Sequence, residues 1–124
     1  MSKGTSRPYL HFVGGNAVDV SGSCTILRFN NIKLALDMGL IQTNNIIADY
    51  RANRDMMKRI KPKTVHGVVI THNHADHVCG LLVAVHMGMN AYIYVPQGSL
   101  PIMRIMLEDC VKIMESDSTK LQNK

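Results

Sequence analysis

Residues 71–77 read Thr-His-Asn-His-Ala-Asp-His, a heptapeptide in which four of seven side chains are imidazoles or carboxylates. It holds three of the six histidines of the chain. The β-branched run at 68–70 before it is typical of a buried strand, and the apolar residues after it have helical spacing. Imidazole and carboxylate are ligands that zinc takes in catalytic sites. We therefore prefer a metal site at a strand-to-helix turn over a polar loop with histidines clustered by chance.

The spacing within the motif divides its ligands into two pairs. In an extended turn, residues two apart project the same way, so His72 and His74 would bind one ion. Asp76 and His77, at the beginning of the helix, would hold a second ion beside it. Two adjacent metal ions can share a hydroxide and stabilise an oxyanion, as phosphodiester hydrolysis requires. Each pair falls short of the three protein ligands usual for catalytic zinc, so we expect up to two zinc ions, incompletely ligated by this chain.

The other histidines have no partner at ligand spacing. We expect His11, His66 and His86 to be surface residues, or core residues whose ring nitrogens have hydrogen-bond partners. The methionines at 87, 89, 103, 106 and 114 are expected to pack in the core.

Strands and helices alternate along the sequence after an opening hairpin. The turn of that hairpin is Asn30-Asn31, a residue type that tolerates positive φ. We expect strands at 9–13, 24–29, 32–37, 65–71 and 91–95, a loop at 16–23, a partly helical segment at 44–60, and helices at 76–89 and 97–116. This order predicts an α/β fold with a mixed sheet and flanking helices.

Composition sets limits on the class of protein. Apolar residues make up 46% and charged residues 19% of the 124 residues, an ordinary globular balance. A net charge of +5 suits a polyanionic partner such as RNA, although solubility explains it equally well. No apolar run is long enough to cross a membrane. The three cysteines, Cys24, Cys79 and Cys110, form no CxxC motif, and we expect a reducing cytoplasm or nucleus.

The motif strand-Thr-His-x-His-x-Asp-His-helix resembles the signature of metallo-β-lactamase-fold hydrolases. Residues 14–15, 21–27 and 36–40 resemble the opening of the β-CASP branch, which includes ribonuclease J and the endonuclease of pre-mRNA 3′-end cleavage. The helix at 107–114 is also similar to that branch. The resemblance implies a partial metallo-β-lactamase fold, the first half of an αββα sandwich. Residues 1–124 would then form a single incomplete domain without the β-CASP insert.

The resemblance also implies roles for individual residues. Asp76 would hold the nucleophilic hydroxide as well as bind metal. Asp37 would not bind the metal itself but would orient the ligands or the nucleophilic water through hydrogen bonds. These two acids are the expected catalytic residues. The remaining assignments are the metal ligands His72, His74 and His77 beside Asp76, and the site rim at Gly14, Gly15 and Ser23.

The sequence departs from the family after this motif. Members complete the metal site with a later histidine and a later aspartate, and no histidine follows His86 here. We expect a short gene product, one part of a split enzyme, or a fragment. The first hypothesis is an RNA-directed nuclease whose activity needs a complementing chain or self-association. An inert remnant that binds RNA or a related protein, and an esterase or thioesterase of the same fold, are the alternatives.

Overall fold

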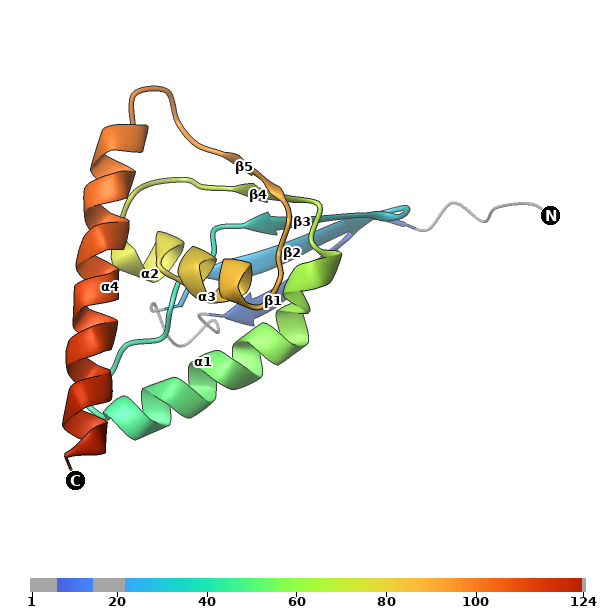
Figure 1. The fold of residues 1–124 in the computed structure, drawn as a ribbon. Coiled ribbons are helices and arrows are strands. Elements are labelled where there is room, and N and C mark those ends of the chain that lie inside the picture. Colours follow the sequence, from blue (N-terminus) through green and yellow to red (C-terminus); the bar gives the residue numbers. More distant parts are fainter. Residues whose placement is uncertain (1–6, 15–21, 124) are drawn as a thin grey trace.

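Five strands form one mixed sheet in the computed structural model, which describes residues 7–14 and 22–123 (Figure 1). The strands are β1 (Tyr9–Gly14), β2 (Cys24–Phe29), β3 (Ile32–Leu36), β4 (Gly67–Val69) and β5 (Tyr92–Tyr94), and they lie in this order across the sheet. The pairs β1–β2 and β2–β3 are antiparallel, whereas β3–β4 and β4–β5 are parallel. The expected α/β fold with a mixed sheet and flanking helices is confirmed.

Four helices and one 3-10 turn accompany the sheet. They are α1 (Ile46–Ile60), η1 (Pro62–Thr64), α2 (Ala75–Val78), α3 (Gly80–His86) and α4 (Leu100–Gln122). Among the residues that the structure describes, no helix is long and apolar enough to cross a membrane. Helix α1 is continuous where we expected a partly helical segment, because the Asn45 side chain accepts a hydrogen bond from the Ala48 amide and caps it.

Several expected elements have different bounds. Helix α4 covers Leu100–Gln122, whereas we expected a helix at 97–116. The expected strand at 65–71 is ordered as a strand only over Gly67–Val69, since the Thr71 amide donates to the Asp37 side chain instead of to a neighbouring strand. The expected helix at 76–89 is divided at Cys79 into α2 and α3. The expected loop at 16–23 lies outside the described residues up to position 21.

The core lies on one face of the sheet. Ile26, Ala35 and Val68 are neighbours in register across β2, β3 and β4, and all three are buried. The helices cover this row with apolar side chains that are also fully or nearly fully buried: Met56, Met57 and Ile60 of α1, and Val78, Leu81 and Ala84 of α2 and α3. Burial of these side chains between the helices and the sheet is the main source of stability on this side of the sheet.

The opposite face of the sheet is apolar and open to solvent. Two of its cross-strand rows each include all five strands and contain no charged residue; they are Leu10, Leu27, Leu34, Gly67 and Tyr92, and Phe12, Thr25, Leu36, Val69 and Tyr94. Phe12 is 66% exposed and Tyr92 is 79% exposed. A contiguous apolar surface of this kind usually marks a contact with another protein segment. We refer to these two rows as the open sheet face.

Helix α4 is linked covalently to the helices that cover the core. Cys79 and Cys110 form a disulfide with a Cα–Cα distance of 6.3 Å. Their separation of 31 residues gave no sign of this pairing in the sequence. Cys24 is free, and burial raises the pKa of its thiol to about 12. Disulfides are rare in reducing compartments, so this bond counts against the expected cytoplasmic or nuclear setting. That setting stays a prediction.

A backbone junction fixes how β3 meets α2. The Ser23 amide donates to the Asp76 carbonyl (2.9 Å), and the Gly39 amide donates to the Ser23 carbonyl (3.0 Å). The Met38 amide donates to the His77 carbonyl (2.8 Å). A Cβ atom on Gly39 would overlap the Asp76 carbonyl oxygen. The residue after Met38 must therefore lack a side chain for the two segments to approach.

Gly39→Ala is expected to lower the free energy of unfolding by about 3 kcal/mol, because the methyl group meets backbone that cannot rotate away. Urea denaturation of the two proteins measures this difference. The control is Gly98→Ala, at a positive φ of 80° with no heavy atom within 4 Å of the added carbon. It should lose only about 1–2 kcal/mol. Equal losses would contradict a role for close backbone packing.

Candidate metal centre

The candidate site begins where two neighbouring parallel strands end. Asp37 follows β3 and Thr71 comes two residues after β4, so both lie at the same edge of the sheet. Asp37 has a positive φ of 59°, which turns the chain out of the strand direction. Its amide still donates to the Val69 carbonyl (2.8 Å), so the turn remains attached to the sheet.

The Asp37 carboxylate accepts three hydrogen bonds although it is only 5% exposed. Its Oδ1 accepts from the Thr71 amide (2.7 Å), and its Oδ2 accepts from the Thr71 hydroxyl (2.7 Å). The third bond joins Oδ2 to His77 Nδ1 (2.8 Å). Three donors compensate for the cost of burying the charge. Asp37 thereby fixes two segments that are 34 and 40 residues away in the sequence.

These bonds determine which nitrogen each imidazole presents. Because the ionised carboxylate can only accept, Nδ1 of His77 carries a proton, and in the neutral ring Nε2 is the nitrogen with the free lone pair. The Thr71 hydroxyl has one proton, and that proton goes to Asp37. Its oxygen, 2.8 Å from His72 Nδ1, must then accept from that nitrogen. His72 therefore also presents a free Nε2, which is the form that binds metal ions.

The remaining motif residues lie around this pair. The ring centroids of His72 and His77 are 4.0 Å apart, and those of His72 and His74 are 4.6 Å apart. An Asp76 carboxylate oxygen lies 3.6 Å from His77 Nε2. The structure thus brings all four predicted ligands and Asp37 into one cluster at the edge of the sheet.

A subset of these residues satisfies the geometry for one ion. Asp37, His72 and His77 each offer a ligand atom, and these atoms lie within 4.8 Å of one another. Imidazole nitrogens and a carboxylate are a donor set that suits zinc and other divalent transition metals. In this structure both Asp37 oxygens already accept hydrogen bonds, so we assign Asp37 to the orientation of His72 and His77. The residues present fit a metal ion.

Sequence reasoning missed Thr71, which bridges His72 to Asp37. The signal was its place directly before the first histidine, where a hydroxyl can bond the ring of its neighbour. Of the expected rim residues, Ser23 contacts the backbone of Asp76, and Gly14 packs closely against Gly22 and Met56. Gly15 lies outside the described residues.

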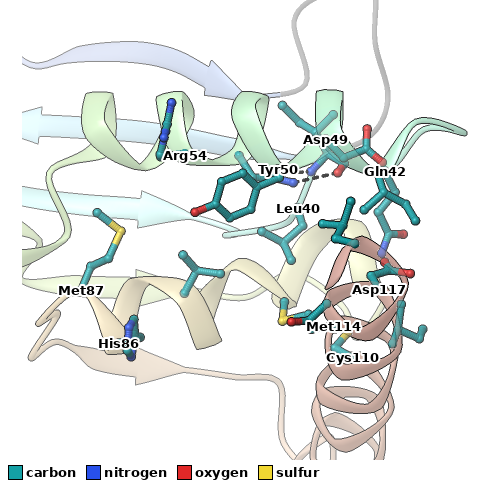
Figure 2. Close-up of a pocket in the computed structure, with 17 residues that line it drawn as sticks. Leu40, Gln42, Asp49, Tyr50, Arg54, His86, Met87, Cys110, Met114 and Asp117 are labelled. Carbon is teal, nitrogen blue, oxygen red and sulfur yellow. Dashed lines mark hydrogen bonds between the residues drawn. The ribbon is translucent and has the colours of Figure 1, made fainter. Parts of the chain in front are cut away.

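The other histidines lie apart from the cluster. His66 Nδ1 accepts a hydrogen bond from the Lys33 amide (2.9 Å), which makes it a structural residue between β3 and β4. His86 lines a cavity of about 580 Å³ between α1, α3 and α4 (Figure 2). The wall of that cavity is mainly apolar and includes Leu40, Met87 and Met114. None of the predicted metal ligands lines it.

Comparisons with known proteins agree with this fold. The family model of the metallo-β-lactamase superfamily matches residues 48–103, a span that includes the motif and excludes Asp37. Ribonuclease TTHA0252 from Thermus thermophilus is 31% identical over 101 residues, covering 82% of this chain and 22% of that protein. Probable RNase MJ4 from Methanocaldococcus jannaschii is 29% identical over 109 residues, covering 86% and 23%. The chain therefore spans less than a quarter of these relatives.

Solved structures show the same architecture at low identity. The metallo-β-lactamase fold protein YhfI from Bacillus subtilis matches with a TM-score of 0.57 and 14% identity, covering 80% of this chain and 41% of YhfI. The protein tm0894 from Thermotoga maritima, provisionally assigned to the metallo-β-lactamases, matches with a TM-score of 0.51 and 15% identity, covering 90% and 56%. The chain has part of the metallo-β-lactamase superfamily fold, and its relatives include proteins named as ribonucleases.

Asp37→Ala is expected to lower the free energy of unfolding by about 2–3 kcal/mol, because buried donors lose a charged acceptor. Zinc affinity, measured by calorimetry, should fall about 10–100-fold as His77 loses its orientation. The matched control is Asp49→Ala, whose carboxylate accepts the same two donors from Thr43 at an exposed position. That variant should leave zinc affinity unchanged. Equal effects on zinc affinity would contradict an orienting role for Asp37.

The variant Thr71→Val tests the orientation of His72 separately from that of His77. The variant keeps the Asp37–His77 bond but removes the hydroxyl that holds His72 Nδ1. We expect zinc affinity to fall while the Asp37–His77 proton signal persists in the NMR spectrum. Unchanged zinc affinity would show that the tautomer of His72 does not depend on Thr71.

Proposed function

We propose that this protein is a zinc-dependent hydrolase of RNA phosphodiester bonds, of the β-CASP branch of the metallo-β-lactamase fold. The observation that carries the proposal is the single buried carboxylate that holds two imidazoles in their metal-binding tautomer. His72 is held through Thr71 and His77 directly. A structural histidine pair on a solvated loop has no need of this arrangement.

RNA is the proposed substrate because of the named relatives and the charge. Both curated relatives cited above are named as ribonucleases. The net charge of +5 suits a polyanion. A cytoplasmic or nuclear setting, where RNA is available, accords with this substrate.

Each residue of the cluster has a role in the proposed reaction. A zinc ion, when bound, would act as a Lewis acid and lower the pKa of water. His72 and His74 would hold one ion, and His77 and Asp76 a second. The Asp76 side chain is 34% exposed, so it can also accept a proton from an incoming water molecule. Asp37 keeps the imidazoles oriented throughout.

The ligand count indicates that other residues complete the site. Two histidines for one position and one histidine with Asp76 for the other leave each below the usual three protein ligands. The open sheet face ends beside the cluster, since Leu36 directly precedes Asp37 and Val69 lies two residues before Thr71. We propose that a segment supplied by further sequence, a complementing chain or a second copy covers this face and contributes the remaining ligands.

An inert remnant is the second candidate, and the incomplete ligand set favours it. An inert protein would bind RNA or a related chain with no dependence on His72 or Asp76. A hydrolase of small esters or thioesters would use the same cluster and have no preference for RNA.

Zinc content separates the metal-dependent hydrolases from the inert remnant. The protein purified with its partner should hold zinc, and His72→Ala should lose most of it, because the variant removes an imidazole at the centre of the cluster. The control is His86→Ala, which changes an exposed histidine on α3 and should keep the metal. Elemental analysis gives the measurement. Zinc content near zero in the unmodified protein, alone and with any partner, would overturn the proposal.

The substrate is tested with the same set of proteins. Cleavage of labelled single-stranded RNA should require zinc and fall at least about 100-fold in His72→Ala. Hydrolysis of a p-nitrophenyl ester or a thioester should stay near background. Ester hydrolysis without RNA cleavage would instead support the esterase alternative.

A further inference from the structure

The positive charge of the chain is concentrated in one short segment. Residues 51–63 contain six cations and one carboxylate, a net charge of +5 that equals the net charge of the whole chain. The remaining sequence is therefore neutral overall. The cations are Arg51, Arg54, Lys58, Arg59, Lys61 and Lys63, and all six are exposed.

Three of these cations form a stripe along α1. Arg51, Arg54 and Lys58 are spaced i, i+3 and i+7, which places them on one side of the helix. Met57 and Ile60, on the other side, are buried in the core. The Arg54 guanidinium lies 5.9 Å from the centroid of the Tyr50 ring, so an exposed aromatic side chain lies beside the stripe (Figure 2).

Neighbouring cations extend the stripe beyond the end of the helix. The buried Lys33 side chain donates to the Ile60 carbonyl and to the Thr64 hydroxyl, which holds the β2–β3 hairpin against the end of α1. Burial lowers the pKa of Lys33, and the nearby charges of Arg28 and Lys61 lower it further. Cations from three segments are thus close enough to repel one another. Such repulsion is relieved when an anion binds.

A solvated helix face is the simplest alternative explanation. The exposed helix α4 shows what such a face looks like here: it has three cations and four carboxylates, with ion pairs between Arg104 and Glu108 and between Lys120 and Asp117. Within 7–14 and 22–123, no ion pair involves the six cations of 51–63. Lys58 and Arg59 also suit the C-terminal dipole of α1. That effect accounts for two cations and leaves four unexplained.

Hydrogen bonds connect α1 to the chain at both ends of β3. At one end of α1, Ile60 is bonded to Lys33 at the beginning of β3. Further along, Asn53 exchanges two hydrogen bonds with Ile41, which comes shortly after Asp37 at the other end of β3. Lys33 and Asp37 are four residues apart, about 13 Å along the strand. A chain of phosphates bound along α1 would therefore follow the direction of β3, which ends next to Asp37.

We propose that the cationic face of α1 and the following turn bind the phosphate backbone of single-stranded RNA and direct it to the metal centre, an inference that rests on the proposed function. The contacts are to phosphates, so the surface recognises the polyanion rather than its sequence. Tyr50 offers a ring on which one base can stack.

The test is the salt dependence of RNA binding. Fluorescence anisotropy with labelled 20-nucleotide oligouridylate is measured in EDTA, where no metal-dependent cleavage occurs. Each cation that contacts a phosphate adds about 0.7 to the slope of log K against log salt for single strands. Arg51→Gln with Lys58→Gln should therefore reduce the slope by about 1.4 and weaken binding about tenfold or more at low salt.

A charge-matched variant controls for net charge. Lys112→Gln with Lys120→Gln removes two exposed cations from α4, and its slope should match that of the unmodified protein. Circular dichroism confirms that both variants are folded. An unchanged slope in the α1 variant, or equal losses in both variants, would overturn the inference. So would α1-dependent binding to phosphatidylserine vesicles or polyglutamate that is tighter than binding to RNA.

The same measurements separate this inference from the proposed function. Binding is expected to persist in His72→Ala, since the α1 surface does not include that residue. RNA binding through α1 with no cleavage would support the surface and contradict the hydrolase. Zinc-dependent cleavage with the slope unchanged in the α1 variant would support the hydrolase and overturn the surface.

Discussion

The buried carboxylate of Asp37 joins three parts of the chain that are distant in sequence. It accepts hydrogen bonds from Thr71, which follows β4, and from His77 in α2. A charge at 5% exposure is stable only when donors surround it, so the folded chain must bring these segments together. The same bonds fix which tautomer the neutral rings of His72 and His77 adopt. The hydrogen bonds of Asp37 therefore stabilise this edge of the sheet and also orient the imidazoles for metal binding.

Close backbone packing makes that arrangement possible. Gly39 and Gly80 both lie where a Cβ atom would overlap the backbone of the other segment. Without side chains at these positions, β3 and α2 approach closely enough for the Met38 amide to reach the His77 carbonyl. The distance between Asp37 and His77 follows from this contact. A small change in this packing would separate the carboxylate from the imidazole that it orients.

The surface of the molecule is divided by chemical character. One face of the sheet is buried under helices, and the open sheet face carries only uncharged residues. The cations lie along α1 and in the turn that follows it, and the histidine cluster lies at the end of β3 that carries Asp37. In our proposals, these regions correspond to a covering segment, a phosphate backbone and a metal ion. The open sheet face adjoins the histidine cluster, so one covering segment can complete both.

The sequence alone determined the order of the elements and the motif. The β-branched run before Thr71 and the helical spacing after it placed His72 and His77 at a strand-to-helix turn, because periodicity is a local property. Local patterns also predicted the hairpin at Asn30. Only the tertiary structure decided that Thr71 bridges His72 to Asp37, that Cys79 pairs with Cys110, and that helix 76–89 divides at Cys79. Each of these depends on contacts between residues that are far apart in the chain or on packing against them, and periodicity carries no information about such distances.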